Sequence, residues 1–189
     1  MLNPKTITIG DFKLEPPRYD LDSNDEILIK ELLEIFSLKE ITKFNTNYKL
    51  DTYFDAAERI YNISLAFRQQ FSYTYRLYDI KANKLVGTIE LFAPIHVHET
   101  HRSISKFSFQ TGDAVRNNIW LIEYYLHPEY WRQGIMTKAV SAIIEELFNQ
   151  NARCVAAVCH NKNVAGNKFL SSLKFIQMIR YKNMKDHFL

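Results

Sequence analysis

Residues 126–137 carry the clearest potential for binding chemistry in the chain. An apolar strand is predicted to end at Leu126, and Gly134 precedes a long amphipathic helix. The first backbone N–H groups of a helix have no partners within it and lie at the positive end of its macrodipole, so they bind phosphate readily. Gly134 lacks Cβ and permits a close approach, while Arg132 and Lys138 add positive charge. We predict a diphosphate site here; the alternative is that Gly134 only shapes the turn.

Histidine and cysteine residues indicate no metal centre. His96, His98 and His101 have the most metal-like spacing, but a loop would have to bring them together because only the first two would share a strand face. Their neighbours are typical of a solvated surface loop, so we predict no metal site. Cys154 and Cys159 lie five residues apart, on opposite faces of a predicted strand, and are expected to be free thiols.

Length and composition limit the class of protein. A chain of 189 residues predicts one domain, and five glycines exclude a phosphate loop with several glycines. The net charge of +3 comes from interspersed charges, so we predict no nucleic-acid partner. We expect no signal peptide and no transmembrane helix, and free cysteines in a chain without a leader predict a cytoplasmic protein.

The apolar pattern predicts the elements that position these residues. Alternation and helical spacing predict short strands within 6–14, a helix from the cap candidates at 22–25 to about 36, a helix at 51–70, strands at 73–80, 85–92 and 119–126, a helix at 135–148, a strand at 154–158, a helix at 164–173 and a final strand at 175–181. Residues 38–50 and 93–118 give no clear pattern. This order predicts an α/β sheet with helices on its faces.

Two motifs resemble those of a known family. Residues 123–139 resemble the acetyl-CoA-binding motif of the GNAT acetyltransferases, most closely the branch with the ribosomal-protein alanine N-acetyltransferases of the RimJ/RimL type. The family motif is Gln/Arg-x-x-Gly-x-Gly/Ala, and Trp131, Gly134 and Met136 fall on its defining positions. Residues 163–175 resemble its Asn-x-x-Ser-x-x-x-Leu-x-x-x-Gly-Phe motif, which Asn163 and Leu170 match. Gly166 replaces the serine and Lys174 the glycine, and residues 86–91 resemble the family's third strand.

The resemblance implies a fold and a cofactor. The fold would be a single GNAT domain over 1–189 with a mixed, mostly antiparallel sheet of about six to seven strands, helices on both faces and a possible insertion at about 93–118. The sheet would splay between the strand that ends near Leu126 and the strand at 154–158. Acetyl-CoA would lie in this opening, with its pantetheine arm along residues 124–126 and its diphosphate on the N–H groups of 132–137. The implied cofactor-binding residues are Tyr125, Leu126, His127, Arg132, Gln133, Gly134, Ile135, Met136, Thr137, Asn163 and Lys168.

The resemblance also implies a mechanism in which the amine attacks the thioester directly. Glu123 is the first candidate for the base, because burial in an apolar strand would raise its pKa towards the working pH; alternatively it faces solvent or pairs with a basic residue. Glu90 is the weaker candidate. Leu170 stands where many members have a catalytic tyrosine, so other hydroxyls would assist the leaving thiolate, namely Tyr124, Tyr125, Ser171 or Ser172, with Glu123, Tyr124 and Ser171 as our catalytic set. Candidates to line the acceptor site are Phe36, Phe44, Tyr48 and Phe54.

We therefore expect an acetyl-CoA-dependent N-acetyltransferase. Its acceptor would be a primary amine, either a protein N-terminus or a small molecule, and the protein would be a monomer or homodimer without a membrane partner. One alternative is a non-catalytic acyl-CoA-binding protein on the same scaffold. A second is an interaction module that uses its amphipathic helices and binds no cofactor.

Overall fold

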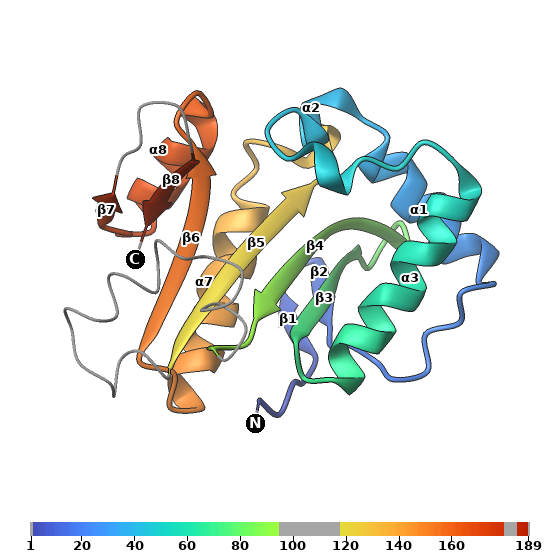
Figure 1. The fold of residues 1–189 in the computed structure, drawn as a ribbon, viewed down its shortest axis with the longest axis horizontal. Helices are drawn as coiled ribbons and strands as arrows, with labels where there is room; N and C mark the ends of the chain where they lie inside the picture. Colours follow the sequence, from blue (N-terminus) through green and yellow to red (C-terminus); the bar gives the residue numbers. More distant parts are fainter. Residues whose placement is uncertain (1, 95–117, 180–184, 189) are drawn as a thin grey trace. The chain divides into compact units, whose positions relative to one another are not determined.

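The computed structural model describes residues 2–94, 118–179 and 185–188 (Figure 1). Contacts divide the chain into two compact units. Unit 1 contains Asn3–Glu90 and Tyr124–Val140, and unit 2 contains Leu91–Glu123 and Ser141–Leu189. Each unit thus combines two stretches of chain, and the single domain stays a prediction. Apart from its ends, the possible insertion at 93–118 lies outside the described residues, as do His96, His98 and His101.

The helices of unit 1 begin at side chains that cap them. The Asp25 carboxylate accepts from the backbone N–H groups of Ile27 and Leu28 at 3.1 and 3.0 Å, which starts α1 (Glu26–Phe36). Thr52 and Asp55 form a reciprocal capping box at the start of α3 (Tyr53–Arg68). Between them, the segment without a clear sequence pattern forms α2 (Lys39–Thr42) and the 3₁₀ turn η1 (Thr46–Tyr48).

The sheet of unit 1 combines the strands of the unit's first stretch of chain with the end of β5, which begins its second stretch. Its strand order is β1-β2-β3-β4-β5, and β1–β2 and β2–β3 are antiparallel. A core of α1, α3 and β4 residues buries the apolar faces of both helices, with Ile29, Phe36, Ile60 and Leu85 among its members. Core packing therefore accounts for these amphipathic helices. The strands are β1 (Ile7–Ile9), β2 (Phe12–Glu15), β3 (Ser72–Asp79), β4 (Lys84–Phe92) and β5 (Ile119–Leu126).

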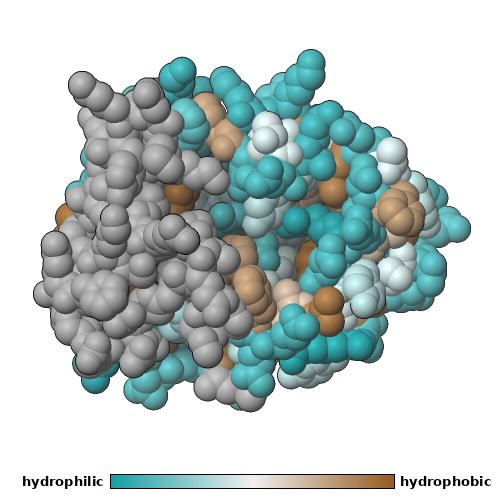
Figure 2. Space-filling model, in the orientation of Figure 1, coloured by the Kyte–Doolittle hydropathy of each residue, from teal (hydrophilic) through white to brown (hydrophobic). Residues whose placement is uncertain are grey.

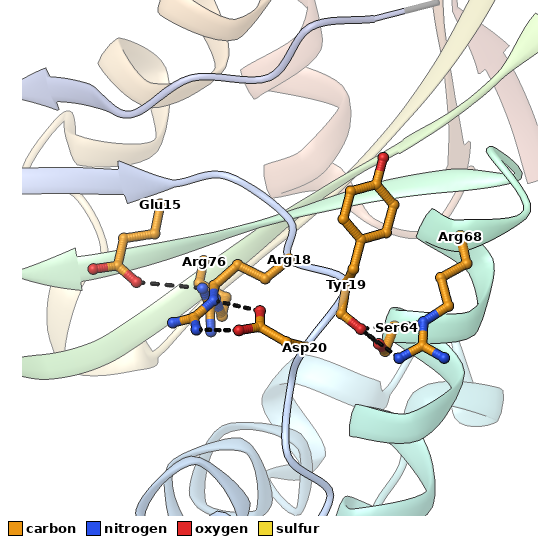
Figure 3. A network of polar contacts seen from close by, with 7 residues as sticks. All are labelled: Glu15, Arg18, Tyr19, Asp20, Ser64, Arg68 and Arg76. Carbon is orange, nitrogen blue, oxygen red and sulfur yellow. Dashed lines mark hydrogen bonds and ion pairs between the residues drawn. The ribbon is translucent and has the colours of Figure 1, made fainter.

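The connection from β2 to α1 is anchored on α3 and β3 (Figure 3). The Tyr19 carbonyl accepts from Ser64 Oγ at 2.8 Å and from Arg68 Nη2 at 2.6 Å. The buried Arg76 guanidinium of β3 donates to the Glu15 carboxylate at 3.3 Å. This connection has no regular structure, and Ser64 and Arg68 supply the partners of its Tyr19 carbonyl.

The division between the units falls within β5, and its residues 119–122, in unit 2, pair in parallel with β6 (Cys154–His160). α7 (Ile135–Asn149) forms the crossover between these two strands, as a parallel connection requires. The strand order of this unit is β5-β6-β8-β7, with β6–β8 and β7–β8 antiparallel, and α8 (Val164–Ser172) contacts β6. Ile119, Leu121 and Ala156 form its buried core cluster.

The fold class is confirmed as a mixed, mostly antiparallel sheet with helices, although the end of the chain differs from the prediction. The final strand, β7 (Gln177–Ile179), begins two residues later than expected, residues 180 and 181 lie outside the described residues, and a further strand, β8 (Lys185–Phe188), follows. β6 extends to His160 because Cys159 and His160 pair with β8. The described residues thus contribute eight strands where six to seven were expected.

Two smaller predictions can be compared with the described residues. Cys154 is half-buried, Cys159 is buried, and both are free thiols, as expected. Among the described helices, none has the length and apolar character needed to cross a membrane. The hydrophobic residues coloured in Figure 2 lie as separate spots among hydrophilic ones on the face shown.

Candidate active site

The first candidate site is the loop between β5 and α7, residues 127–134, which we call the cofactor loop. The His127 N–H donates to the Val86 carbonyl of β4 at 2.8 Å, so the loop begins fixed to the sheet of unit 1. It continues as the 3₁₀ turn η2 (Pro128–Tyr130). The Tyr130 hydroxyl donates to Asp79 of β3 at 3.4 Å, and burial, with this carboxylate nearby, raises the pKa of that hydroxyl. Tyr130 is thus a neutral anchor of the loop.

The loop delivers the chain to the start of α7 with two residues in left-handed conformation. Arg132 has φ +60° and Gly134 has φ +73°, and only glycine adopts this conformation without strain. A Cβ added at Gly134 would meet no atom within 4 Å, so backbone conformation, and not space, requires glycine there. The Lys138 N–H donates to the Gly134 carbonyl at 3.1 Å as the first helical bond, so the preceding N–H groups of α7 have no partner within the helix.

Trp131 connects this loop back to the end of β5. Its indole Nε1–H donates to the Leu126 carbonyl at 2.6 Å, while 43% of the residue is exposed. Trp131 stands where the resembling family motif has Gln or Arg. Met136, which stands at the Gly/Ala position, is 7% exposed, so its side chain is buried in the protein.

The histidine of the loop lies between two carboxylates. His127 Nε2 is 3.9 Å from Glu34 of α1, and Nδ1 is 3.8 Å from Glu129. Glu34 also accepts from Lys84 at 2.7 Å, and this hydrogen bond raises the pKa of the lysine. These contacts tie the first residue of the loop to α1 and to β4.

The end of β5 points its backbone groups in alternating directions. The Tyr125 carbonyl faces β4 so closely that a Cβ at Gly87 would collide with it. The N–H and C=O of one residue in a strand point to the same side, and those of the next residue point to the other side. The Leu126 groups are therefore directed away from β4. In unit 2, the last residue of β5 that pairs with β6 is Ile122, one residue before Glu123.

The second motif forms the start of α8 in unit 2. The Asn163 side chain caps this helix by accepting from the Gly166 N–H at 2.9 Å. A Cβ at Gly166 would lie 2.7 Å from Asn163 Nδ2 and 2.8 Å from Cys159 Sγ. Glycine therefore replaces the serine of the family motif because the folded-in Asn163 and the buried Cys159 take up the space. Lys168 is exposed on the same helix.

This packing predicts that restoring the family residue will harm the protein. We expect Gly166→Ser to lower the free energy of unfolding by about 1–3 kcal/mol, because the new side chain overpacks a filled site. Thermal unfolding monitored by circular dichroism measures the effect. Ala165→Ser, on the exposed side of the same turn, is the matched control and should leave the melting temperature nearly unchanged. Equal melting temperatures for the two variants would contradict the packing argument.

The predicted catalytic residues differ in their surroundings. Glu123 and Tyr124 are half-buried in β5. Ser171 is exposed, and its hydroxyl donates to the Asn167 carbonyl of its own helix at 3.0 Å; Ser172 does the same to Phe169 at 2.6 Å. Leu170, at the position of the family's tyrosine, is fully buried.

Glu90 lies in a cluster of polar and aromatic side chains, the Glu90 cluster, formed by Glu90, Arg59, Tyr48, Ser72 and Phe36. Its carboxylate accepts from Ser72 Oγ at 2.8 Å and from the Tyr48 hydroxyl at 3.2 Å, and Arg59 Nη2 lies 3.7 Å away. The Arg59 guanidinium lies over the rings of Tyr48 and Phe36, at 4.3 and 4.8 Å. With both oxygens accepting and a cation beside it, this carboxylate is better suited to positioning than to removing a proton.

The loop 43–49 meets this cluster and β5. Asn45 Nδ2 donates to the Tyr125 hydroxyl at 3.0 Å, and the Tyr48 and Tyr125 ring centroids lie 4.9 Å apart. Of the other aromatic candidates for the acceptor site, Phe44 is half-buried and Phe54 is 73% exposed. Sequence reasoning missed Arg59. A cationic residue on the core-facing side of the predicted helix at 51–70 is unusual, and it could have indicated a buried polar contact.

No metal centre accompanies these sites in the described part of the chain. Among the residues at 2–94, 118–179 and 185–188, no three His, Cys, Asp or Glu side chains are grouped to hold a metal ion.

A comparison with known protein families gives a match over most of the chain. Residues 20–176 match the family model described as "Acetyltransferase (GNAT) domain". The chain is 13% identical to a GNAT-family acetyltransferase from Bacillus anthracis, with a TM-score of 0.68 over 97% of this chain and 95% of that one. It is 15% identical to the ribosomal-protein-S5-alanine acetyltransferase of Vibrio fischeri, with a TM-score of 0.60 over 98% and 94%.

A third similar structure contains a ligand. This is the aminoglycoside acetyltransferase AAC(6′)-Ib in complex with coenzyme A, 14% identical, with a TM-score of 0.62 over 85% of this chain and 87% of that one. At such identities the three structures establish a shared fold and nothing finer. No curated protein sequence matches the chain significantly.

Proposed function

The chain belongs to the GNAT acetyltransferase family, and from this premise we propose that it transfers an acetyl group from acetyl-CoA to a primary amine by direct attack of the amine on the thioester. The observation that carries the proposal is the family match, which includes the cofactor loop and α7. Two of the similar structures are named as a ribosomal-protein-S5-alanine acetyltransferase and as an aminoglycoside acetyltransferase. They support the two acceptor classes proposed here, a protein N-terminus and a small-molecule amine.

The diphosphate of acetyl-CoA is proposed to bind at the start of α7. The N–H groups of Ile135, Met136 and Thr137 precede the first helical hydrogen bond and lie at the positive end of a helix of 15 residues. Arg132, Gln133 and Gly134 are exposed at this helix start, and Lys138 is exposed in its first turn. A double negative charge is stabilised by such an arrangement without a glycine-rich loop.

A substitution at Arg132 separates its charge from its backbone conformation. In Arg132→Gly the left-handed conformation no longer costs about 1 kcal/mol, which offsets the extra chain entropy of glycine, so the melting temperature should stay within about 2 °C. The Kd for coenzyme A should rise about three- to tenfold, because a cation beside the diphosphate is lost. Isothermal titration calorimetry measures this change. Lys30→Gln, which removes an exposed charge from α1, is the control; an unchanged Kd in Arg132→Gly would exclude the contact.

The rest of the cofactor is assigned by the resemblance alone. The pantetheine arm would lie along residues 124–126, next to His127. Asn163 and Lys168 would contribute from α8, and Asn163 would do so with the amide nitrogen, because its oxygen caps the helix. These contacts remain predictions for a structure with bound coenzyme A.

Glu123 is proposed as the base that removes the proton from the amine, directly or through water. Tyr124 or Ser171 is proposed as the donor to the leaving thiolate, and the Ser171 hydroxyl would have to turn from the Asn167 carbonyl of its own helix to do so. The Glu90 cluster, with Phe36 and Tyr48, is proposed as part of the acceptor side. In this scheme Glu90 positions Tyr48 and does not act as the base.

The alternative, a non-catalytic acyl-CoA-binding protein, is favoured by one observation. Leu170 is fully buried where many members have a catalytic tyrosine, so no hydroxyl is available at that position. Mixing the protein with acetyl-CoA and a panel of peptides, aminoglycosides, polyamines and amino acids, and measuring free thiol, distinguishes the two. Thiol release with any amine supports the transferase. Binding of coenzyme A without release for any acceptor supports the alternative, and failure of coenzyme A to raise the melting temperature excludes both.

A further inference from the structure

We propose that Trp131 is a positioning residue that holds the end of β5 for the pantetheine arm of acetyl-CoA. This inference rests on the proposed function, which lays the arm along residues 124–126. The cofactor loop therefore has two tasks: it presents the start of α7 to the diphosphate, and through one indole it shapes the strand that receives the arm.

The indole of Trp131 forms its hydrogen bond at the end of β5. The Trp131 N–H donates to the Leu126 carbonyl at 2.6 Å. The His127 N–H is directed to the Val86 carbonyl of β4, and backbone directions alternate along a strand, so the Leu126 carbonyl is directed away from β4. This is the side on which an added strand or strand-like ligand would pair. Trp131 thus occupies an acceptor on the edge that faces the proposed ligand.

The hydrogen bond from Trp131 to Leu126 also affects how the pantetheine arm pairs with β5. An indole N–H donates only one hydrogen bond and accepts none, so its partner must be an acceptor such as this carbonyl. A carbonyl oxygen has two lone pairs, so the indole bond fixes the direction of the Leu126 carbonyl and leaves it able to accept from an amide of the pantetheine arm. The arm is therefore held in one position along β5, and the thioester reaches one place.

Hydrogen bonds also hold Trp131 itself in place. Trp131 is fixed at both ends, because its backbone N–H donates to the Pro128 carbonyl at 3.0 Å and its indole reaches Leu126. It directly precedes Arg132 at the start of the left-handed turn. A movement of the strand end is thus transmitted to the helix start by one stiff side chain.

The test compares two ligands that differ only in the arm. Coenzyme A contains pantetheine, whereas 3′-phosphoadenosine 5′-diphosphate keeps the diphosphate and lacks the arm. For Trp131→Phe, which keeps a ring but loses the donor, we expect the Kd for coenzyme A to rise about tenfold and the Kd for the fragment to stay within about twofold. Trp131→Gln, which restores a donor, should recover most of the affinity for coenzyme A.

A second measurement reports on Trp131 itself. The chain has two tryptophans, and Trp120 is only 9% exposed, so Trp120→Phe leaves Trp131 as the single indole emitter. Coenzyme A should shift its emission, and the fragment should shift it much less. A loss of affinity that is equal for both ligands, or no loss at all, would overturn the inference. If the unaltered protein binds neither ligand, the proposed function itself fails, which is a separate outcome.

Discussion

Gly134→Glu is expected to abolish the binding of coenzyme A while the protein stays folded. A Cβ at this position would meet no atom within 4 Å, so a longer side chain can extend into solvent without a collision. The backbone at φ +73° adds a penalty of about 1–2 kcal/mol, which a domain of this size tolerates. The loss of binding therefore arises at the helix start and not from unfolding.

The reason is electrostatic. A carboxylate next to the first turn accepts from the same backbone N–H groups that the diphosphate needs, as a capping Asp or Glu does. It also repels the negative charges of the ligand. Together these effects should raise the Kd at least about a hundredfold, corresponding to roughly 2.8 kcal/mol. Calorimetry with coenzyme A and the shift in melting temperature at saturating ligand measure the loss independently.

The chain contains a close control for this experiment. Gly10, in the turn between β1 and β2, has φ +65° and also has no atom within 4 Å of an added Cβ. Gly10→Glu introduces the same charge and a similar backbone penalty away from the cofactor loop. Its melting temperature should fall like that of Gly134→Glu, and its affinity for coenzyme A should stay normal. Similar affinities for coenzyme A in both variants would contradict the placement of the diphosphate at the start of α7.

Departures from the family motifs acquire physical reasons once neighbouring atoms are known. Gly166 replaces a serine because Asn163 and Cys159 fill the space beside it. Trp131 replaces Gln or Arg and donates an N–H to the strand end. The bulk of Met136 is buried. None of these differences by itself argues that the chain has lost the family's chemistry.

The sequence predicted elements well where a single strong pattern decided them. The buried run of β5 and the apolar stripe of α7 appear within one residue of their predicted ends. Residues 185–188 were missed because three charged or polar residues precede a single phenylalanine and give no alternation, and only pairing with β6 and β7 makes them a strand. The segment 38–50 was missed for the related reason that its contacts are made with distant residues, such as Tyr125 and Glu90.

The candidate site was predictable to the extent that it is local. Gly134 was identified because a glycine before an amphipathic helix is visible in one short stretch. The bond from Trp131 to Leu126 and the ion pair of Arg59 with Glu90 depend on which side a backbone or helix faces, which spacing alone does not determine. Glu90 and Glu123 looked alike as carboxylates on apolar strands. The donors around Glu90, which the sequence did not reveal, suit that carboxylate to positioning.

Glu123→Gln is expected to lower turnover at pH 7 by at least about a hundredfold and to leave the Kd for coenzyme A within about twofold. The amide has the shape of the carboxylate but cannot accept a proton from the attacking amine. An α-amino group has a pKa of about 8, so the acceptor is mostly protonated at pH 7 and mostly neutral above pH 9. The defect should therefore shrink as the pH rises, because a neutral amine needs less help from a base.

Two further variants make this result decisive. Glu145→Gln removes an exposed carboxylate from α7 and should leave turnover unchanged. Glu90→Gln weakens the pairing with Arg59 and Tyr48, so it should lower the melting temperature and raise the KM for the amine more than it lowers kcat. Thiol release measured from pH 6 to pH 9 for all three variants separates the roles. A pH-dependent loss of kcat in Glu90→Gln, with none in Glu123→Gln, would show that Glu90 is the base. Glu123 would then have no part in the removal of the proton.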